Sequence, residues 1–282
     1  MKKIINIILL TVIIAFSTVN AQDFQGVATY KTHRDFDIKM DSTKMNDAKQ
    51  KQIMEMMKKQ FQKTYILTFD KKESLYQQEE ELDKPQVGSG FQMSLGSSGS
   101  DVFYKNIKDK RYVDQKETMG KRFLIKDSIS PIEWKLESDT KHIGEYMCFK
   151  ATYTKQVPKI NFNFSSNSNN DEEKDEAEAP EMIERTVTAW YTPQIPVSNG
   201  PAKYQGLPGL ILEIHDGKLT VICSKIVINP EEKNEIEAPS KGKEVSQTEY
   251  DDIMEKKSKE MLERYAPSRG AKDGTIHITV GG

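Results

Sequence analysis

The chain has 282 residues, of which 36% are hydrophobic and 30% charged, with a formal net charge of −2. That length is enough to bury a substantial core. The near balance of charge excludes the strongly basic composition of nucleic-acid binders, so we expect no nucleic-acid partner.

The first 21 residues have the pattern of a secretory signal peptide. Lys2 and Lys3 are followed by an apolar run from Ile4 to Phe16, and Val19-Asn20-Ala21 supplies small residues at a cleavage site. A signal anchor is the alternative, but the run is shorter than the roughly 20 residues that a membrane span needs. We therefore expect cleavage after Ala21, a periplasmic or extracellular protein, and no transmembrane segment in the mature chain.

Residues 22–282 are predicted to form a single domain that begins with a strand at 27–34. The segment 47–63 contains strong helix formers and no Gly or Pro, and its apolar residues recur at helical spacing. It is predicted as a surface helix. A hairpin turning at Asp70-Lys71-Lys72 follows, and then a Gly/Ser-rich loop at 87–100.

The middle of the chain is strand-rich and contains one strongly polar segment. The predicted strands are VFYKNIK, RYVDQKETM and KRFLIKDS, then two short strands within 132–153, and MIERTVTAWY. Before the last of these, residues 161–181 are polar, acidic and nearly free of aliphatics. Because such a segment buries too little apolar area to offset its ordering entropy, we predict a disordered insertion between two paired strands.

A helix and a strand are predicted near the C-terminus. Ser246 and Glu249 fit a capping box that opens a helix from Gln247 to about Tyr265. The segment GTIHITVGG then reads as a closing strand. Strands dominate and hairpin-length connections outnumber helical crossovers, which favours an α+β fold: a mainly antiparallel, curved β-sheet with a few helices packed on one side.

The hexapeptide GLPGLI, at Gly206 to Ile211, places two glycines and a proline beside large aliphatics. Pro208 and Gly209 suit the two central positions of a type II turn, where Gly accepts the positive φ. Gly206 is expected to allow backbone or an aromatic ring to approach closely. A buried strand is predicted from Leu210, followed by a hairpin at Asp216-Gly217 and a partner strand to Ile228.

The stretch AWYTPQIPVSNGPAKYQGLPGLILEI, residues 189–214, resembles the signature of the GLPGLI family of exported Bacteroidetes proteins. Supporting matches are WKLESDTKHIGEYMCFKATY at 134–153 and CSKIVINP at 223–230. The function of that family is uncharacterised, so the resemblance implies export but no catalytic residues.

Two cysteines occur, Cys148 and Cys223, both inside predicted strands. In an exported protein an even count favours a disulfide between them. The alternative is a pair of unpaired buried thiols, because Cys packs as a small hydrophobe.

Motifs for metals, nucleotides and nucleophilic catalysis are missing from the sequence. The four histidines, at 33, 142, 215 and 277, lie at no metal-binding spacing, and no HExxH, CxxC, GxSxG, Walker A or Rossmann pattern occurs. Met54, Met56 and Met57 belong to the apolar side of the predicted helix and favour packing over copper binding. We therefore expect no metal and no cofactor.

Two functions remain open. The favoured one is a non-enzymatic binding or accessory module for an apolar ligand or an envelope partner, with Trp190, Tyr191 and Tyr204 on its rim. The alternative to a binding rim is that these three aromatic side chains simply pack against the sheet. The second function is a hydrolase whose site is assembled only by the fold.

Overall fold

The computed structural model describes residues 24–35, 37–40, 51, 55, 62–79, 101–158, 181–265 and 276–279. The predicted signal peptide, the loop at 87–100 and nearly all of the acidic insertion lie outside the described residues. So does most of the helix predicted at 47–63, of which Lys51 and Glu55 are described as helical and exposed.

In the described residues the chain forms fourteen strands and the helix α3: β1 Gln25–Arg34, β2 Asp37–Met40, β3 Thr64–Asp70, β4 Glu73–Gln78, β5 Val102–Asn106, β6 Arg111–Thr118, β7 Lys121–Ser128, β8 Lys135–Ile143, β9 Tyr146–Pro158, β10 Met182–Thr192, β11 Leu210–Asp216, β12 Leu219–Ile228, β13 Lys243–Val245, α3 Gln247–Tyr265 and β14 Ile276–Thr279. No helix in this described part of the chain has the length and apolarity of a membrane span.

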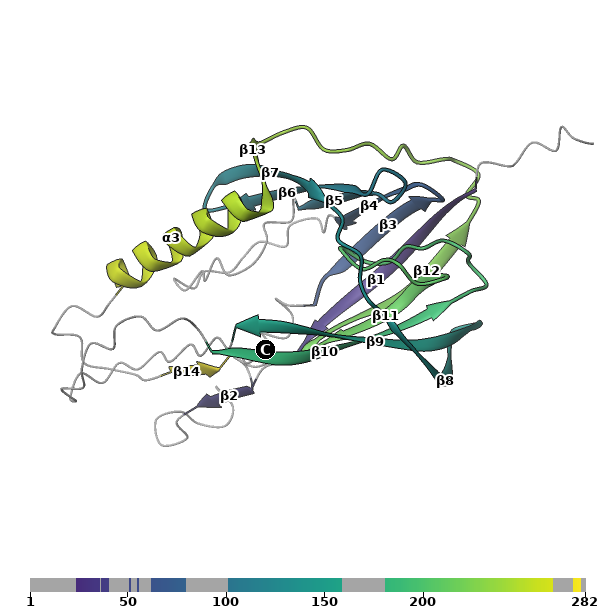
Figure 1. Ribbon diagram of the computed structural model, residues 1–282, viewed down its shortest axis with the longest axis horizontal. Helices are drawn as coiled ribbons and strands as arrows, with labels where there is room; N and C mark the ends of the chain where they lie inside the picture. Colours follow the sequence, from purple (N-terminus) through teal and green to yellow (C-terminus); the bar gives the residue numbers. More distant parts are fainter. Residues whose placement is uncertain are drawn as a thin grey trace, which may run out of the picture.

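Twelve strands form one sheet in the order β13-β7-β6-β5-β4-β3-β1-β12-β11-β10-β9-β8, and β14 pairs with β2 separately. The neighbours in the large sheet are antiparallel except β13 and β7, which are parallel. The sheet is strongly curved: β3 to β7 lie in an upper part and β8 to β12 in a lower part, with β1 crossing between them (Figure 1).

The predicted α+β class is wrong. The described chain is mainly β, and the helix α3 lies against β7 at one end of the sheet (Figure 1). The Pro-rich segment 193–209, which has no regular secondary structure, instead packs on one face of the sheet through buried hydrophobic side chains. The antiparallel character was predicted correctly, but a covering layer without regular secondary structure leaves no periodic pattern in the sequence.

Short hairpins build most of this sheet, and their turn residues explain the pairing. Asp70 Oδ1 accepts hydrogen bonds from the backbone N–H groups of Lys72 and Glu73, at 2.6 and 2.7 Å, which closes the β3–β4 turn. Between β11 and β12 the two loop residues are Gly217 and Lys218, and Gly217 has φ 61°. Both predicted hairpins are therefore confirmed, the second with its loop one residue further along.

The C-terminal helix and its capping box are also confirmed. The Ser246 N–H donates to Glu249 Oε2 at 2.7 Å, and the Glu249 N–H donates to Ser246 Oγ at 3.2 Å. Tyr250 of α3 then packs edge-on against Phe123 of β7, with ring centroids 5.4 Å apart. The cap thus fixes where the helix starts, and the aromatic contact fixes it to the sheet.

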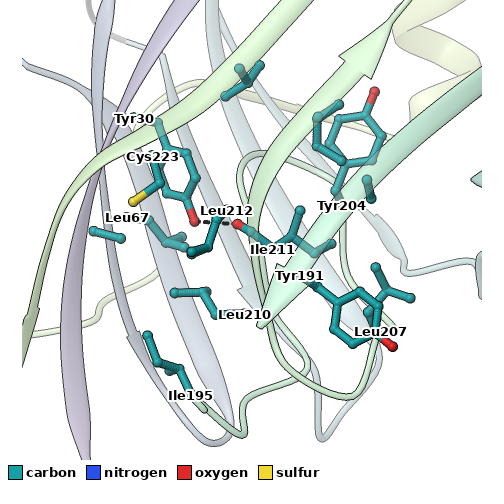
Figure 2. Packing of buried hydrophobic residues seen from close by; sticks show 14 of the residues in the cluster. Tyr30, Leu67, Tyr191, Ile195, Tyr204, Leu207, Leu210, Ile211, Leu212 and Cys223 are labelled. Carbon is teal, nitrogen blue, oxygen red and sulfur yellow. Dashed lines mark hydrogen bonds between the residues drawn. The ribbon is translucent and has the colours of Figure 1, made fainter. Parts of the chain in front are cut away.

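The main core lies on the face of the sheet that segment 193–209 covers, called the inner face below. Tyr30 of β1 and Ile211 of β11 are fully buried there, and the Tyr30 hydroxyl donates to the Ile211 carbonyl at 2.7 Å (Figure 2). The hydrophobic side chains that the covering segment buries in this core are Ile195, Val197, Tyr204 and Leu207. Burial of these apolar side chains holds the segment on the sheet.

The insertion between β9 and β10 is expected to be dispensable for stability. Met182 pairs directly with Pro158 across the two strands, so a short turn can join them. Replacing residues 161–181 with a Gly/Ser turn should change the free energy of unfolding by less than about 1 kcal/mol, since little apolar surface is removed. Urea unfolding measures this, and a large loss would mean that the segment contributes to the fold.

Candidate functional site

Strands β11 and β12 separate from each other along half of their length. They pair only from Glu213 to Asp216, opposite Ile222 to Leu219. Beyond that point β12 stays paired with β1, whereas the start of β11 turns to the covering segment. The Leu210 N–H donates to the Ile195 carbonyl at 3.0 Å, and the Ile211 N–H donates to the Asn199 carbonyl at 2.9 Å. The result is a split within the sheet.

A cavity of about 430 Å³ lies at this split. The tip of the β8–β9 hairpin forms one wall, and Leu212 with the diverging part of β12 forms the other. Its lining residues are Ile143, Gly144, Glu145, Tyr146, Leu212, Cys223, Ser224, Lys225 and Ile226. Small-molecule sites span roughly 300–1,000 Å³, so a small ligand fits this space.

Two of the side chains that line the cavity, Cys223 and Tyr146, have a raised pKa. Burial raises the pKa of the Cys223 thiol to about 12. Burial, followed by the nearby Glu145 carboxylate, raises the pKa of Tyr146. Since the thiolate is the nucleophilic form of cysteine, Cys223 lines the cavity as a protonated thiol and not as an attacking group.

The predicted disulfide is absent, because Cys148 and Cys223 are both free and buried. Cys148 lies on β9 and Cys223 on β12, and two strands, β10 and β11, separate these in the sheet order. Burial also raises the pKa of Cys148, to about 11. The alternative of two buried thiols is the one observed.

A cluster of charged groups surrounds Asp216 at the end of β11. Lys155 Nζ lies 2.5 Å from Asp216 Oδ2, Arg185 Nη1 lies 3.5 Å from Oδ1, and the Tyr204 hydroxyl donates to Oδ2 at 2.7 Å. Burial alone would raise the pKa of Asp216, but the hydrogen bonds from Lys155 and Tyr204 hold it below its usual value. Burial and the bond to Asp216 raise the pKa of Tyr204. Asp216 is therefore a carboxylate at neutral pH.

A fully buried lysine holds the covering segment from the other part of the sheet. Lys105 of β5 donates from Nζ to the carbonyls of Gly200 and Tyr204, at 2.7 and 3.0 Å, and burial lowers its pKa well below the usual value. Beside it, Asn199 Oδ1 accepts from Ser74 Oγ at 3.2 Å. Asn199 Nδ2 is buried and has no hydrogen-bond partner among the described residues.

The opposite face of the sheet, called the outer face, carries a second polar group. Glu213 is buried and accepts from Lys141 at 2.6 Å and also contacts His215 Nε2, while His215 Nδ1 lies 3.2 Å from Thr220 Oγ1. The Lys141 ammonium also lies 4.4 Å from the centroid of the Trp190 ring. The His215 imidazole therefore lies between the Thr220 hydroxyl and the Glu213 carboxylate, in contact with both.

The three residues expected on a binding rim lie in different places. Trp190 is half-buried on the outer face under Lys141, and its neighbour Tyr191 is buried beside Phe149, with ring centroids 6.2 Å apart. Successive residues of a strand point to opposite faces, so Trp190 and Tyr191 do not share a surface. Tyr204 belongs to the Asp216 cluster. The structure brings none of these three side chains to the cavity at the split.

In the hexapeptide the positive φ lies at Gly206 and not at Gly209, and the Trp134 ring lies beside Gly206. Gly206 has φ 96°, whereas Gly209 is not in the left-handed region, so the type II turn with Gly209 at its third position is wrong. Pro208 is exposed between them, and the Gly209 N–H donates to the Leu207 carbonyl at 2.8 Å. Gly209 instead lies against the backbone of Thr192.

Sequence reasoning missed Lys105, Lys155, Arg185 and the role of Asp216 as a carboxylate centre. Lys155 and Arg185 are cross-strand partners in β9 and β10, and this pairing could have indicated the cluster. The long insertion between the two strands prevented us from predicting which residues face each other. Within the described residues, no group of three or more His, Cys, Asp or Glu side chains is placed to hold a metal ion.

Residues 134–213, from the start of β8 into β11, match the model of a family described as a protein of unknown function (Porph_ging). No curated protein matches the chain. Two solved structures of PNGF-II, in space groups C2 and P21, are 17% identical with a TM-score of 0.46. The alignments cover 83% and 82% of this chain but only 33% of the PNGF-II chains, so this chain spans about a third of their length. Similarity at this level says nothing about activity.

Proposed function

We propose that the chain is an exported binding module whose cavity at the split takes a small apolar molecule. The resemblance of residues 189–214 to the GLPGLI signature, together with the N-terminal leader pattern, supports export as a single domain to the periplasm or beyond. The observation that carries the proposal is the cavity of about 430 Å³ at the split, with Ile143, Leu212 and Ile226 in its walls.

The chemistry of the walls favours binding over catalysis. A protonated thiol and a protonated phenol offer weak donors without a charge, and the aliphatic side chains offer apolar contact. Ile143, Leu212 and Ile226 suit the apolar part of a ligand, because contact with them removes apolar surface from water. Glu145 and Lys225 belong to the lining and suit a ligand with one polar end.

A cavity-filling substitution tests this function. N-phenyl-1-naphthylamine, a neutral apolar dye, should bind saturably with a rise in fluorescence. Ile226→Trp should weaken its binding at least about tenfold, equivalent to about 1.4 kcal/mol, because the indole occupies the space that the dye needs. Ile222→Trp, on the same strand but outside the cavity lining, is the matched control and should bind normally.

The melting temperatures of both variants should be measured first, because a change in dye binding reports on the cavity only when the variant is folded like the wild type. Equal dye binding by wild type, Ile226→Trp and Ile222→Trp would place the dye elsewhere and contradict the proposal. As a second readout, bound dye should slow the alkylation of Cys223, which lines the cavity.

A hydrolase is the second candidate, and the Thr220–His215–Glu213 series favours it. The same Glu213 oxygen also receives Lys141, and these residues do not line the cavity described above. Hydrolysis of p-nitrophenyl acetate that His215→Ala abolishes would favour this candidate over the binding module.

A further inference from the structure

The paired strands β9 and β10 place two cations directly opposite each other. Arg185 is the cross-strand partner of Lys155, so both side chains point to the same face. Like charges in this position repel, and such a pair destabilises a sheet unless an anion lies between them. Here the anion is Asp216 of the next strand, β11.

One carboxylate does not satisfy both cations. Lys155 is 2.5 Å from Asp216 Oδ2, but the Arg185 contact to Oδ1 is longer, at 3.5 Å. Arg185 Nε is buried and donates to no described residue, and Asp216 Oδ1 accepts no hydrogen bond. Asp216 Oδ2 is already shared by Lys155 and the Tyr204 hydroxyl. The guanidinium therefore has a buried N–H that is available to a further acceptor.

A third cation, Lys203, lies beside this group. It precedes Tyr204 in the covering segment, its side chain is exposed, and no carboxylate of a described residue pairs with it. Its pKa is lowered, first by desolvation and next by the positive charge of Lys155, while Asp216 acts in the opposite direction. The positive charge of Lys116 on β6 also lowers the pKa of Lys203. Lys116 itself forms an ion pair with Asp114 at 2.9 Å.

We propose that Lys155, Arg185 and Lys203 form a site for a phosphate group. Three cations around one carboxylate leave a formal excess of two positive charges, which a phosphate dianion neutralises. Its tetrahedral oxygens accept from the guanidinium fork and from both ammonium groups. The shared chemistry is a phosphate monoester or free phosphate, from solution or from a lipid headgroup.

Titration calorimetry on the full chain tests the site with inorganic phosphate. Binding should be saturable at constant ionic strength, and sodium chloride should not replace phosphate. Lys203→Met should weaken binding at least about tenfold, because the exposed lysine contributes charge and not packing. Lys31→Met, an exposed lysine of β1 away from the cluster, should bind phosphate as the wild type does.

Two further measurements separate this site from a general charge effect and identify the source. In lysine labelled at Cε, the NMR-detected pKa of Lys203 should rise when phosphate binds, since an anion favours the charged ammonium. Vesicles of phosphatidylcholine with phosphatidic acid, compared with phosphatidylcholine alone, test the headgroup. Binding of phosphate and of vesicles indicates a general phosphate site, and binding of vesicles alone indicates a headgroup site.

The proposal is overturned if neither probe binds or if Lys203→Met binds either probe as tightly as Lys31→Met. None of the substituted residues lines the cavity at the split. The result is therefore independent of whether the cavity takes an apolar ligand.

Discussion

A Gly209→Ala variant is expected to lose about 2–4 kcal/mol of unfolding free energy, because overpacking against backbone is not relieved by a side-chain rotation. A Cβ on Gly209 would lie 2.5 Å from the carbonyl carbon of Thr192 and closer still to its oxygen. Thr192 ends β10 and Gly209 immediately precedes β11, and these strands pair at Thr192 and Leu210. The clash therefore separates two neighbouring strands of the large sheet at the point where they begin to pair.

The neighbouring glycine supplies the matched comparison. At Gly206 an added Cβ meets only the Trp134 ring at 3.7 Å, so Gly206→Ala should cost only the strain of φ 96°, about 1–2 kcal/mol. Asparagine tolerates positive φ better than alanine does. Gly206→Asn should thus be milder than Gly206→Ala, whereas Gly209→Asn should be at least as harmful as Gly209→Ala.

Urea unfolding of the four variants separates these two roles. A Gly209→Asn variant that is clearly more stable than Gly209→Ala would indicate a positive φ at Gly209 and contradict the close approach described here. If Gly209→Ala retained the wild-type melting temperature but lost dye binding, a direct functional role would replace the structural one.

Local chemistry made several elements predictable from the sequence. The capping box of Ser246 and Glu249 fixed the start of α3, and the Gly217 turn fixed the β11–β12 hairpin, because each signal acts within a few residues. The hexapeptide shows where local reasoning ends. Pro-Gly has the composition of a type II turn, but the group that excludes a side chain at Gly209 belongs to Thr192, which is distant in sequence.

The strand order could not be predicted for a similar reason. β1 lies between β3 and β12, so its neighbours come from both ends of the chain. Such pairing depends on non-local packing and not on periodicity. The candidate sites also depend on non-local contacts. The cavity lies where β11 separates from β12 at Leu212, and Lys105 donates a hydrogen bond to Gly200, 95 residues further along the chain.

Lys105 gives the last prediction, a stability difference that depends on pH. At about pH 10, Lys105→Met should lower the free energy of unfolding by about 1–3 kcal/mol, because the carbonyls of Gly200 and Tyr204 lose their donor while remaining buried. The thioether chain has a similar length, so loss of packing contributes little. The covering segment then loses its polar attachment to β5.

As pH falls, this difference should shrink. The folded pKa of Lys105 is well below its unfolded value of about 10.5, so below pH 10.5 the unfolded chain binds a proton that the folded chain does not. Wild-type stability therefore rises with pH between the folded pKa and 10.5 and falls as pH drops through that window, by at most about 1.4 kcal/mol per pH unit. Lys105→Met lacks this term, so its stability should depend less on pH.

Urea unfolding at half-unit steps between pH 7 and pH 10 measures both curves, with Lys31→Met as the control for loss of an exposed lysine. The Lys31→Met curve should run parallel to the wild type, and the Lys105→Met curve should converge on it toward lower pH. Parallel curves for Lys105→Met would show that the buried amine titrates as it does in the unfolded chain. Burial disfavours the charged form of Lys105, and the same amine donates to both Gly200 and Tyr204. We therefore expect amide exchange at residues 200–204 of the wild type to become faster as the pH falls and the ammonium forms.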